Sequence, residues 1–173
     1  PRGLQWSELP ADDEAGWARM LDVAPYFQPH DVSSGAGIDA AQPLASASYP
    51  YPIMVSNADL APETVTGLIT TLVESFDDYK DNAPGASGYA FENQNMTWVV
   101  PFHDAVVTYY KKIGVWSDDM EAHQNSLVER QQLLIDTWEA YRADAPEEEA
   151  AFIDGWMETR RTTLQDAGLN PVF

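Results

Sequence analysis

The chain contains no cysteine in its 173 residues. This excludes disulfide bonds, thiol catalysis and cysteine-ligated zinc, but it does not choose a cellular compartment. Basic residues are also scarce, with 9 Lys and Arg against 28 Asp and Glu and a net charge of -19. Such a surface cannot neutralise phosphates or dock on anionic lipid, so we expect no nucleic-acid partner. The acidity is most simply that of a solvated, self-repelling surface.

Long apolar runs are missing as well. No stretch approaches the roughly 20 residues that a membrane-spanning helix needs. No signal peptide is visible at Pro1, and the chain does not begin with Met. We therefore expect a processed product, a trimmed chain or a piece of a longer protein. The hydrophobic content of 45% is typical of a globular protein, and the length suits one domain with a real core.

Motifs that would indicate catalysis or metal binding are also missing. His30, His103 and His123 lie far apart and show no metal-ligand spacing. There is no GxSxG or SxxK sequence, and Gly35-Ala36-Gly37 lacks the rest of a dinucleotide-binding fingerprint. We therefore expect a protein that is not an enzyme and that uses neither a cofactor nor a metal.

Apolar periodicity, caps and prolines predict a helix-rich α/β fold. Helices are expected over residues 11–23, from Pro62 to about Phe76, over a short stretch at 90–96, and over 104–113, 117–143 and 144–168. Residues 29–43 have loop composition, whereas 44–56 and 98–100 are expected to be extended, with a short strand after the prolines. The short connector between the last two helices predicts an antiparallel helical hairpin. We accordingly divide the chain into an α/β part, 1–116, and a C-terminal hairpin, 117–173, that packs on it.

Two ordered motifs carry a resemblance to a known family. The extended segment 51–60 leads into a helix with Glu63, Val65, Leu72 and Glu74, and a later helix begins after Pro101 and ends at Gly114. That second motif contains His103, Ala105, Tyr109 and Tyr110. The pair resembles the C-terminal portion of the TAXI family, the solute receptors of TRAP-type transporters. The resemblance covers about 4–141 and is strongest over 53–116, whereas the Gly-rich N-terminal segments of the family are not in this chain.

The resemblance implies a fold and a function. The family has a periplasmic-binding-protein type II fold, in which two α/β lobes joined by a hinge close on a solute. This chain would supply the late part of one lobe, the hinge return and C-terminal helices. The resemblance implies a periplasmic receptor for a small organic acid or amino acid. Its partners would be the membrane permease subunits and the missing N-terminal portion of the receptor.

Candidate ligand-binding residues lie in two short non-helical segments, each of which precedes a strong helix. They are Tyr49, Tyr51, Trp98, Phe102 and His103. Two such joints can line a cleft, and helix N-termini can offer backbone N–H groups to an anion. The alternative is that these residues are hinge or core aromatics. An alternative function is a non-catalytic acidic helical interaction module, in which the hairpin and its Glu147-Glu148-Glu149 run dock a basic partner.

Overall fold

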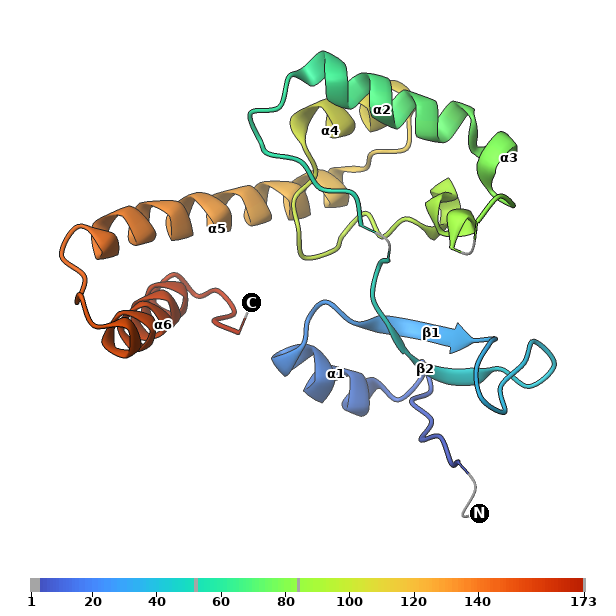
Figure 1. Ribbon diagram of the computed structural model, residues 1–173, viewed down its shortest axis with the longest axis horizontal. Helices are drawn as coiled ribbons and strands as arrows, with labels where there is room; N and C mark the ends of the chain where they lie inside the picture. Colours follow the sequence, from blue (N-terminus) through green and yellow to red (C-terminus); the bar gives the residue numbers. More distant parts are fainter. Residues whose placement is uncertain (1–3, 52, 84, 173) are drawn as a thin grey trace. The chain divides into compact units, whose positions relative to one another are not determined.

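The structure is a computed structural model that describes residues 4–51, 53–83 and 85–172. Its elements fall into two compact units. Figure 1 shows these elements in colours that follow the sequence from the N-terminus to the C-terminus. The first unit contains the described residues up to Tyr49 together with those from Ala145 onward, and the second runs from Pro50 to Asp144. Over these described residues the chain is helix-rich with one small sheet, which confirms the broad α/β expectation.

Helix α1 (Glu14–Val23) opens the first unit. It begins three residues later than predicted, because the Asp13 carboxylate accepts a hydrogen bond from the Gly16 N–H at 2.9 Å and so caps the helix. Trp17 is buried, and its indole N–H donates to the carbonyl of Pro10 at 3.0 Å. This contact holds the chain entering the helix against the helix itself.

The sheet of the first unit is an antiparallel pair, β1 (Gln28–Val32) and β2 (Leu44–Ser48). Its register runs from Gln28 opposite Ser48 to Val32 opposite Leu44. The predicted loop at 29–43 is therefore wrong over its first residues. Pro29 is tolerated because each strand of a two-stranded sheet has a free edge, where a missing N–H breaks no ladder bond.

The predicted short strand after the prolines is also wrong. The strand lies before them, at Leu44–Ser48, and residues 53–55 have no regular secondary structure. Extended conformation alone does not make a strand, because a strand needs a partner for its backbone N–H and C=O groups.

Helix α6 (Glu149–Asp166) completes the first unit. Its cap is Glu148 and not Asp144, because the Glu148 carboxylate accepts hydrogen bonds from Ala150 and Ala151 N–H at 3.1 and 2.7 Å. These bonds lower the pKa of Glu148, with the bond from Ala151 contributing most. One acid of the Glu147-Glu148-Glu149 run thus has a structural role. Beyond the helix, Gly168 has a φ of 70°, as expected of a C-terminal stop.

The second unit is built mainly from helices. They are α2 (Pro62–Glu74), α3 (Phe76–Tyr79), the 3₁₀ turns η1 (Ala86–Tyr89) and η2 (Phe91–Asn93), α4 (Asp104–Lys112) and α5 (Asp118–Arg142). The predicted helices at 62–76, 104–113 and 117–143 are confirmed, and the Ser117 hydroxyl caps α5 by accepting from Met120 N–H at 3.2 Å. The stretch at 90–96 forms only a 3₁₀ turn, and 98–100 forms bends instead of an extended segment.

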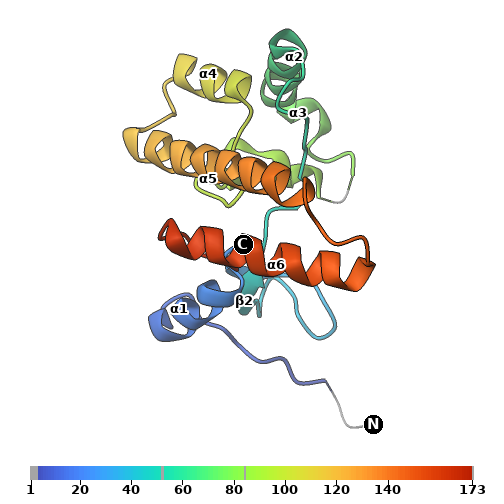
Figure 2. The same cartoon turned by 90° about the vertical axis from the view of Figure 1, so that its left-hand side faces the viewer.

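Helices α2 and α4 pack against each other. The N-terminal end of α5 lies near α4 in both views (Figures 1 and 2), and the rest of α5 extends beyond the pair in Figure 1. Among the described residues of the second unit, most of the buried ones lie on α4: Ala105, Val107, Tyr109 and Tyr110. The apolar face of α2, expected to be core, is buried only at Val65, and Leu68 remains 45% exposed. Much of that face is therefore available to line a cavity.

Helix α4 ends in a Schellman motif. Gly114 has a φ of 76°. The N–H of Val115 donates to Tyr110 C=O and that of Gly114 to Lys111 C=O, both at 3.1 Å. The turn sends the chain back so that Trp116 stacks on Tyr110, with ring centroids 6.3 Å apart. The glycine thus decides where α4 stops and where Trp116 lies.

The two helices of the expected C-terminal hairpin belong to different units, α5 to the second and α6 to the first. Their antiparallel packing, and with it the division at residue 116, stays a prediction. Within the described part of the chain, no helix is long and apolar enough to cross a membrane.

Candidate functional site

The second unit contains a cavity of about 640 Å³, which is the size of a typical small-molecule pocket. Its walls come from residues 53–60, from the apolar face of α2, from the segment 89–106 and from the middle of α5. Most of the lining side chains are aliphatic or aromatic. The site is therefore a concave, mainly apolar surface with a few polar groups.

The two sequence motifs meet at this cavity. Leu60 ends the first motif's extended segment, and His103 opens the helix of the second. The His103 Nε2–H donates to the Leu60 carbonyl at 3.1 Å, across 43 positions of sequence. Residues on both sides of this hydrogen bond line the cavity. The bond therefore joins two walls of the same site.

His103 has a second role as the cap of α4. Its Nδ1 accepts a hydrogen bond from Ala105 N–H at 3.1 Å, so Nδ1 carries no proton in this arrangement. The proton then resides on Nε2, which matches the donation to Leu60. Both ring nitrogens of the neutral imidazole are thus engaged within the protein.

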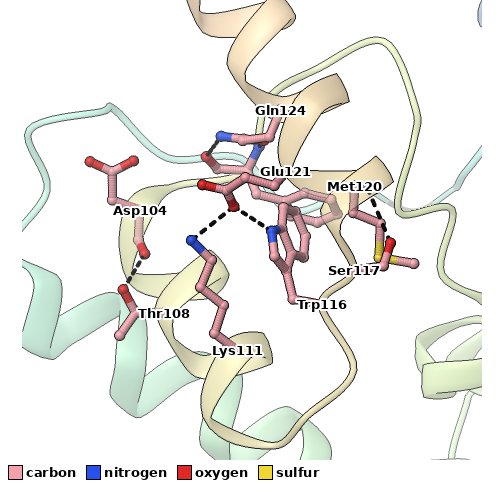
Figure 3. A network of polar contacts seen from close by, with 9 residues as sticks. Asp104, Thr108, Lys111, Trp116, Ser117, Met120, Glu121 and Gln124 are labelled. Carbon is pink, nitrogen blue, oxygen red and sulfur yellow. Dashed lines mark hydrogen bonds and ion pairs between the residues drawn. The ribbon is translucent and has the colours of Figure 1, made fainter.

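Two side chains of α5 hold the segment that leads into α4. Gln124 is buried, and its amide bonds to Phe102 twice: Nε2 donates to Phe102 C=O at 2.8 Å, and Oε1 accepts from Phe102 N–H at 2.9 Å. His123 Nε2–H donates to the Trp98 carbonyl at 2.6 Å. Figure 3 shows the Gln124 amide turned toward this backbone. Together these bonds fix the wall of the cavity that carries Trp98 and Phe102.

A polar bridge ties the end of α4 to the start of α5 (Figure 3). Glu121 Oε2 accepts from Lys111 Nζ at 2.8 Å and from the Trp116 indole N–H at 2.6 Å. The hydrogen bond from Lys111 is the main reason that the pKa of Glu121 lies below its ordinary value, and that from Trp116 adds to it. The bridge therefore orients Trp116, whose ring packs edge-on against Phe102 with centroids 5.9 Å apart.

Tyr110 forms part of the cavity wall and of the aromatic cluster behind it. Its ring meets Phe91 and Phe102 edge-on, with centroids 5.6 and 5.8 Å apart. Burial raises the pKa of Tyr110, and the neighbouring Tyr109 raises it further. The phenol therefore stays neutral at physiological pH and presents a polar tip on a rigid apolar support.

The charges around the cavity do not match the expected anion site. Among the described residues of the lining, Asp104 carries the only formal charge, and neither Lys nor Arg occurs. The first turns of α2 and α4 contain the acids Glu63 and Asp104. Arg130 is not among the lining residues but belongs to an adjoining, smaller cavity of about 250 Å³, which shares Val100, Pro101, Gln131 and Ile135 with the site.

The structure brings together three of the five predicted site residues. Trp98, Phe102 and His103 line the cavity. Tyr51 is 79% exposed and is not part of the lining. Tyr49 belongs to the first unit, where its ring meets that of Phe27 with centroids 6.2 Å apart. Of the residues named at the two joints, only those before α4 therefore line the cavity.

The sequence prediction missed other parts of the site. The apolar face of α2, including Leu68, Ile69 and Leu72, forms a wall, although its helical spacing indicated core. Gln124 was not recognised either, although it directly follows His123, which the sequence places on the apolar stripe of α5. Its role requires the backbone of Phe102, 22 residues away.

No metal centre accompanies the cavity: within residues 4–51, 53–83 and 85–172, no three His, Asp or Glu side chains come close enough to hold an ion. Comparison of the chain with protein-family models, curated proteins and solved structures finds no match. The cavity and the two motifs that line it are therefore the features of the chain that indicate a function.

Proposed function

We propose that this chain is part of a non-catalytic solute receptor of a TRAP-type transporter and binds a small organic solute in the cavity of its second unit. One observation carries the proposal: two motifs that resemble the TAXI family, at 51–60 and 101–114, meet at one cavity through the His103–Leu60 hydrogen bond. The periplasmic-binding-protein type II fold, a periplasmic location and delivery to a membrane permease are parts of this proposal that rest on the resemblance.

The proposal also includes a second part of the receptor. Apolar side chains at the cavity remain open to solvent, with Val55 77%, Met54 49% and Leu68 45% exposed. Surfaces of this kind are found where another protein part or a ligand packs. We propose that the missing N-terminal portion of the receptor covers them and closes the cavity over the solute.

The test is binding to the full chain, screened by ligand-observed NMR and thermal shift with organic acids, amino acids and neutral aromatic compounds. A ligand present at about 100 times its Kd stabilises the protein by about 2.7 kcal/mol, which a thermal shift detects. Trp98→Ala, in the cavity wall, should weaken binding at least about tenfold, because it removes a large ring from the contact surface.

Trp138→Ala is the matched control, since Trp138 lies on α5 of the same unit but outside the lining. It should leave the affinity unchanged. The proposal is refuted if no compound of the screen binds, or if the two Trp variants bind equally well.

A further inference from the structure

The chemistry of the cavity narrows the class of solute. Under the TAXI resemblance an organic acid or amino acid would be expected, and a carboxylate in a mainly apolar site needs a cation or several free N–H groups. Among the lining residues described by the structure, none is a Lys or Arg. The cavity thus lacks the partner that a carboxylate most requires.

The helix N-termini leave few N–H groups to replace that partner. The Ala105 N–H of α4 already donates to His103 Nδ1, and the N–H groups of Val106 and Val107 donate to the His103 carbonyl. Helix α2 begins with Pro62, which has no N–H, and its Thr64 and Val65 N–H groups donate to the Ala61 carbonyl. A carboxylate at α4 would also face the like charge of Asp104.

The same groups suit a cation or a neutral polar group. Asp104 offers a carboxylate at the edge of the cavity, where it is exposed to solvent. Trp98 and Phe102 contribute aromatic rings to the lining, and the faces of such rings attract cations. The aliphatic walls from α2 and residues 53–55 suit an apolar body.

We propose that the cavity binds a mainly apolar solute whose polar group is neutral or cationic, and that it disfavours a free carboxylate. This inference rests on the proposed function, and it narrows the solute of that same site. If the whole receptor binds an organic acid, the residues that hold its carboxylate lie outside this cavity.

Three compounds of nearly equal shape test the inference: 3-phenylpropylamine, 3-phenylpropan-1-ol and 3-phenylpropanoate. Their affinities for the full chain are measured by NMR titration, with the amide signals of Trp98 and Val106 reporting on the cavity. A salt concentration of about 0.3 M screens the general attraction of the acidic protein for cations. We expect the amine and the alcohol to bind at least tenfold more tightly than the carboxylate.

Asp104→Asn assigns the preference to the cavity. It should bring the amine to the affinity of the alcohol and reduce the disadvantage of the carboxylate. Asp118→Asn is the matched control, because Asp118 is also in the first turn of a helix of this unit but does not line the cavity. It should leave the order of affinities unchanged.

The outcomes distinguish the inference about the charge of the solute from the proposed function. Equal binding of all three compounds, or tightest binding of the carboxylate, overturns the inference about charge and leaves the proposed function standing. An equal effect of the two Asp variants also overturns it, because the preference would then come from the overall charge. Failure of all three compounds and of the wider screen to bind would refute the proposed function itself.

Discussion

Replacement of Gln124 by Leu removes the contact that holds the cavity wall to α5. Leu has nearly the same size as Gln but can neither donate nor accept a hydrogen bond. The substitution therefore deletes the bonds to Phe102 C=O and N–H, at 2.8 and 2.9 Å, and leaves that backbone donor and acceptor without a protein partner. A buried polar group that loses its partner costs about 1–3 kcal/mol. Because Phe102 is half-buried and water reaches part of it, we expect a total loss of about 2–4 kcal/mol.

Native-state amide hydrogen exchange measures this loss in the second unit, and urea unfolding followed by circular dichroism measures it for the whole chain. The Phe102 amide should exchange markedly faster in the variant, and the α4 amides should lose about the same free energy of opening. Gln132→Leu is the control on the same helix, because Gln132 is exposed and its amide donates to Asp136 four residues on, at 2.8 Å. It should change stability by less than about 0.5 kcal/mol. A Gln124→Leu variant that stays within that same margin would show that the amide does not hold the wall.

Three further predictions concern the same unit. Gly114→Ala should lower stability by about 1 kcal/mol in urea unfolding, because the φ of 76° is unfavourable for any residue with a Cβ. Gly67→Ala, within α2 and with open space around the added Cβ, should instead raise stability by up to about 1 kcal/mol. If both alanine variants were destabilised, or both stabilised, backbone conformation would not be the cause. Glu121 has a lowered pKa, so its contribution is present above its ordinary value of 4.5 and is lost as the pH falls through the folded value. Glu121→Gln should therefore flatten the acid side of a pH series of thermal melts, and an unchanged acid slope would argue against the bridge to Lys111. Tyr110 has a raised pKa, so its contribution to stability is present below the ordinary value of 10.0 and is lost as the pH rises through the folded value. Tyr110→Phe should therefore flatten the alkaline side of the same pH series. An unaltered alkaline slope would count against burial as the cause of the raised pKa.

The two hydrogen bonds of the His103 ring show how one side chain can both cap a helix and hold a wall of the cavity. Its ring caps α4 through Nδ1 and reaches Leu60 through Nε2, so a single neutral imidazole fixes both the start of a helix and the end of the 53–60 segment. The sequence marked His103 as the residue before a helix and as part of a family-like motif. The partner at Leu60 was not visible, because nothing local relates two residues 43 positions apart.

The amino-acid sequence by itself determined the helix ends of the second unit. Three local features set these helices: the Ser117 cap, the Gly114 stop and the apolar repeat of α2. Each acts within one or two helical turns, so it can be predicted without knowing which distant residues the helix contacts. The charge balance and the lack of cysteine are likewise properties of composition.

Only the tertiary structure decided which of these elements form the site. The face of α2 that periodicity assigned to core is half-open and lines the cavity, because amphipathicity shows that a face is apolar but not what covers it. The pairing of β1 with β2 and the clamp of Gln124 on Phe102 join groups that are distant in sequence. Tyr49 is absent from the cavity because it belongs to the other compact unit. Tyr51 belongs to the same unit as the cavity, but its side chain is exposed to solvent instead of lining it. Local patterns fix local hydrogen bonds, whereas a cavity depends on which distant surfaces the whole fold brings together.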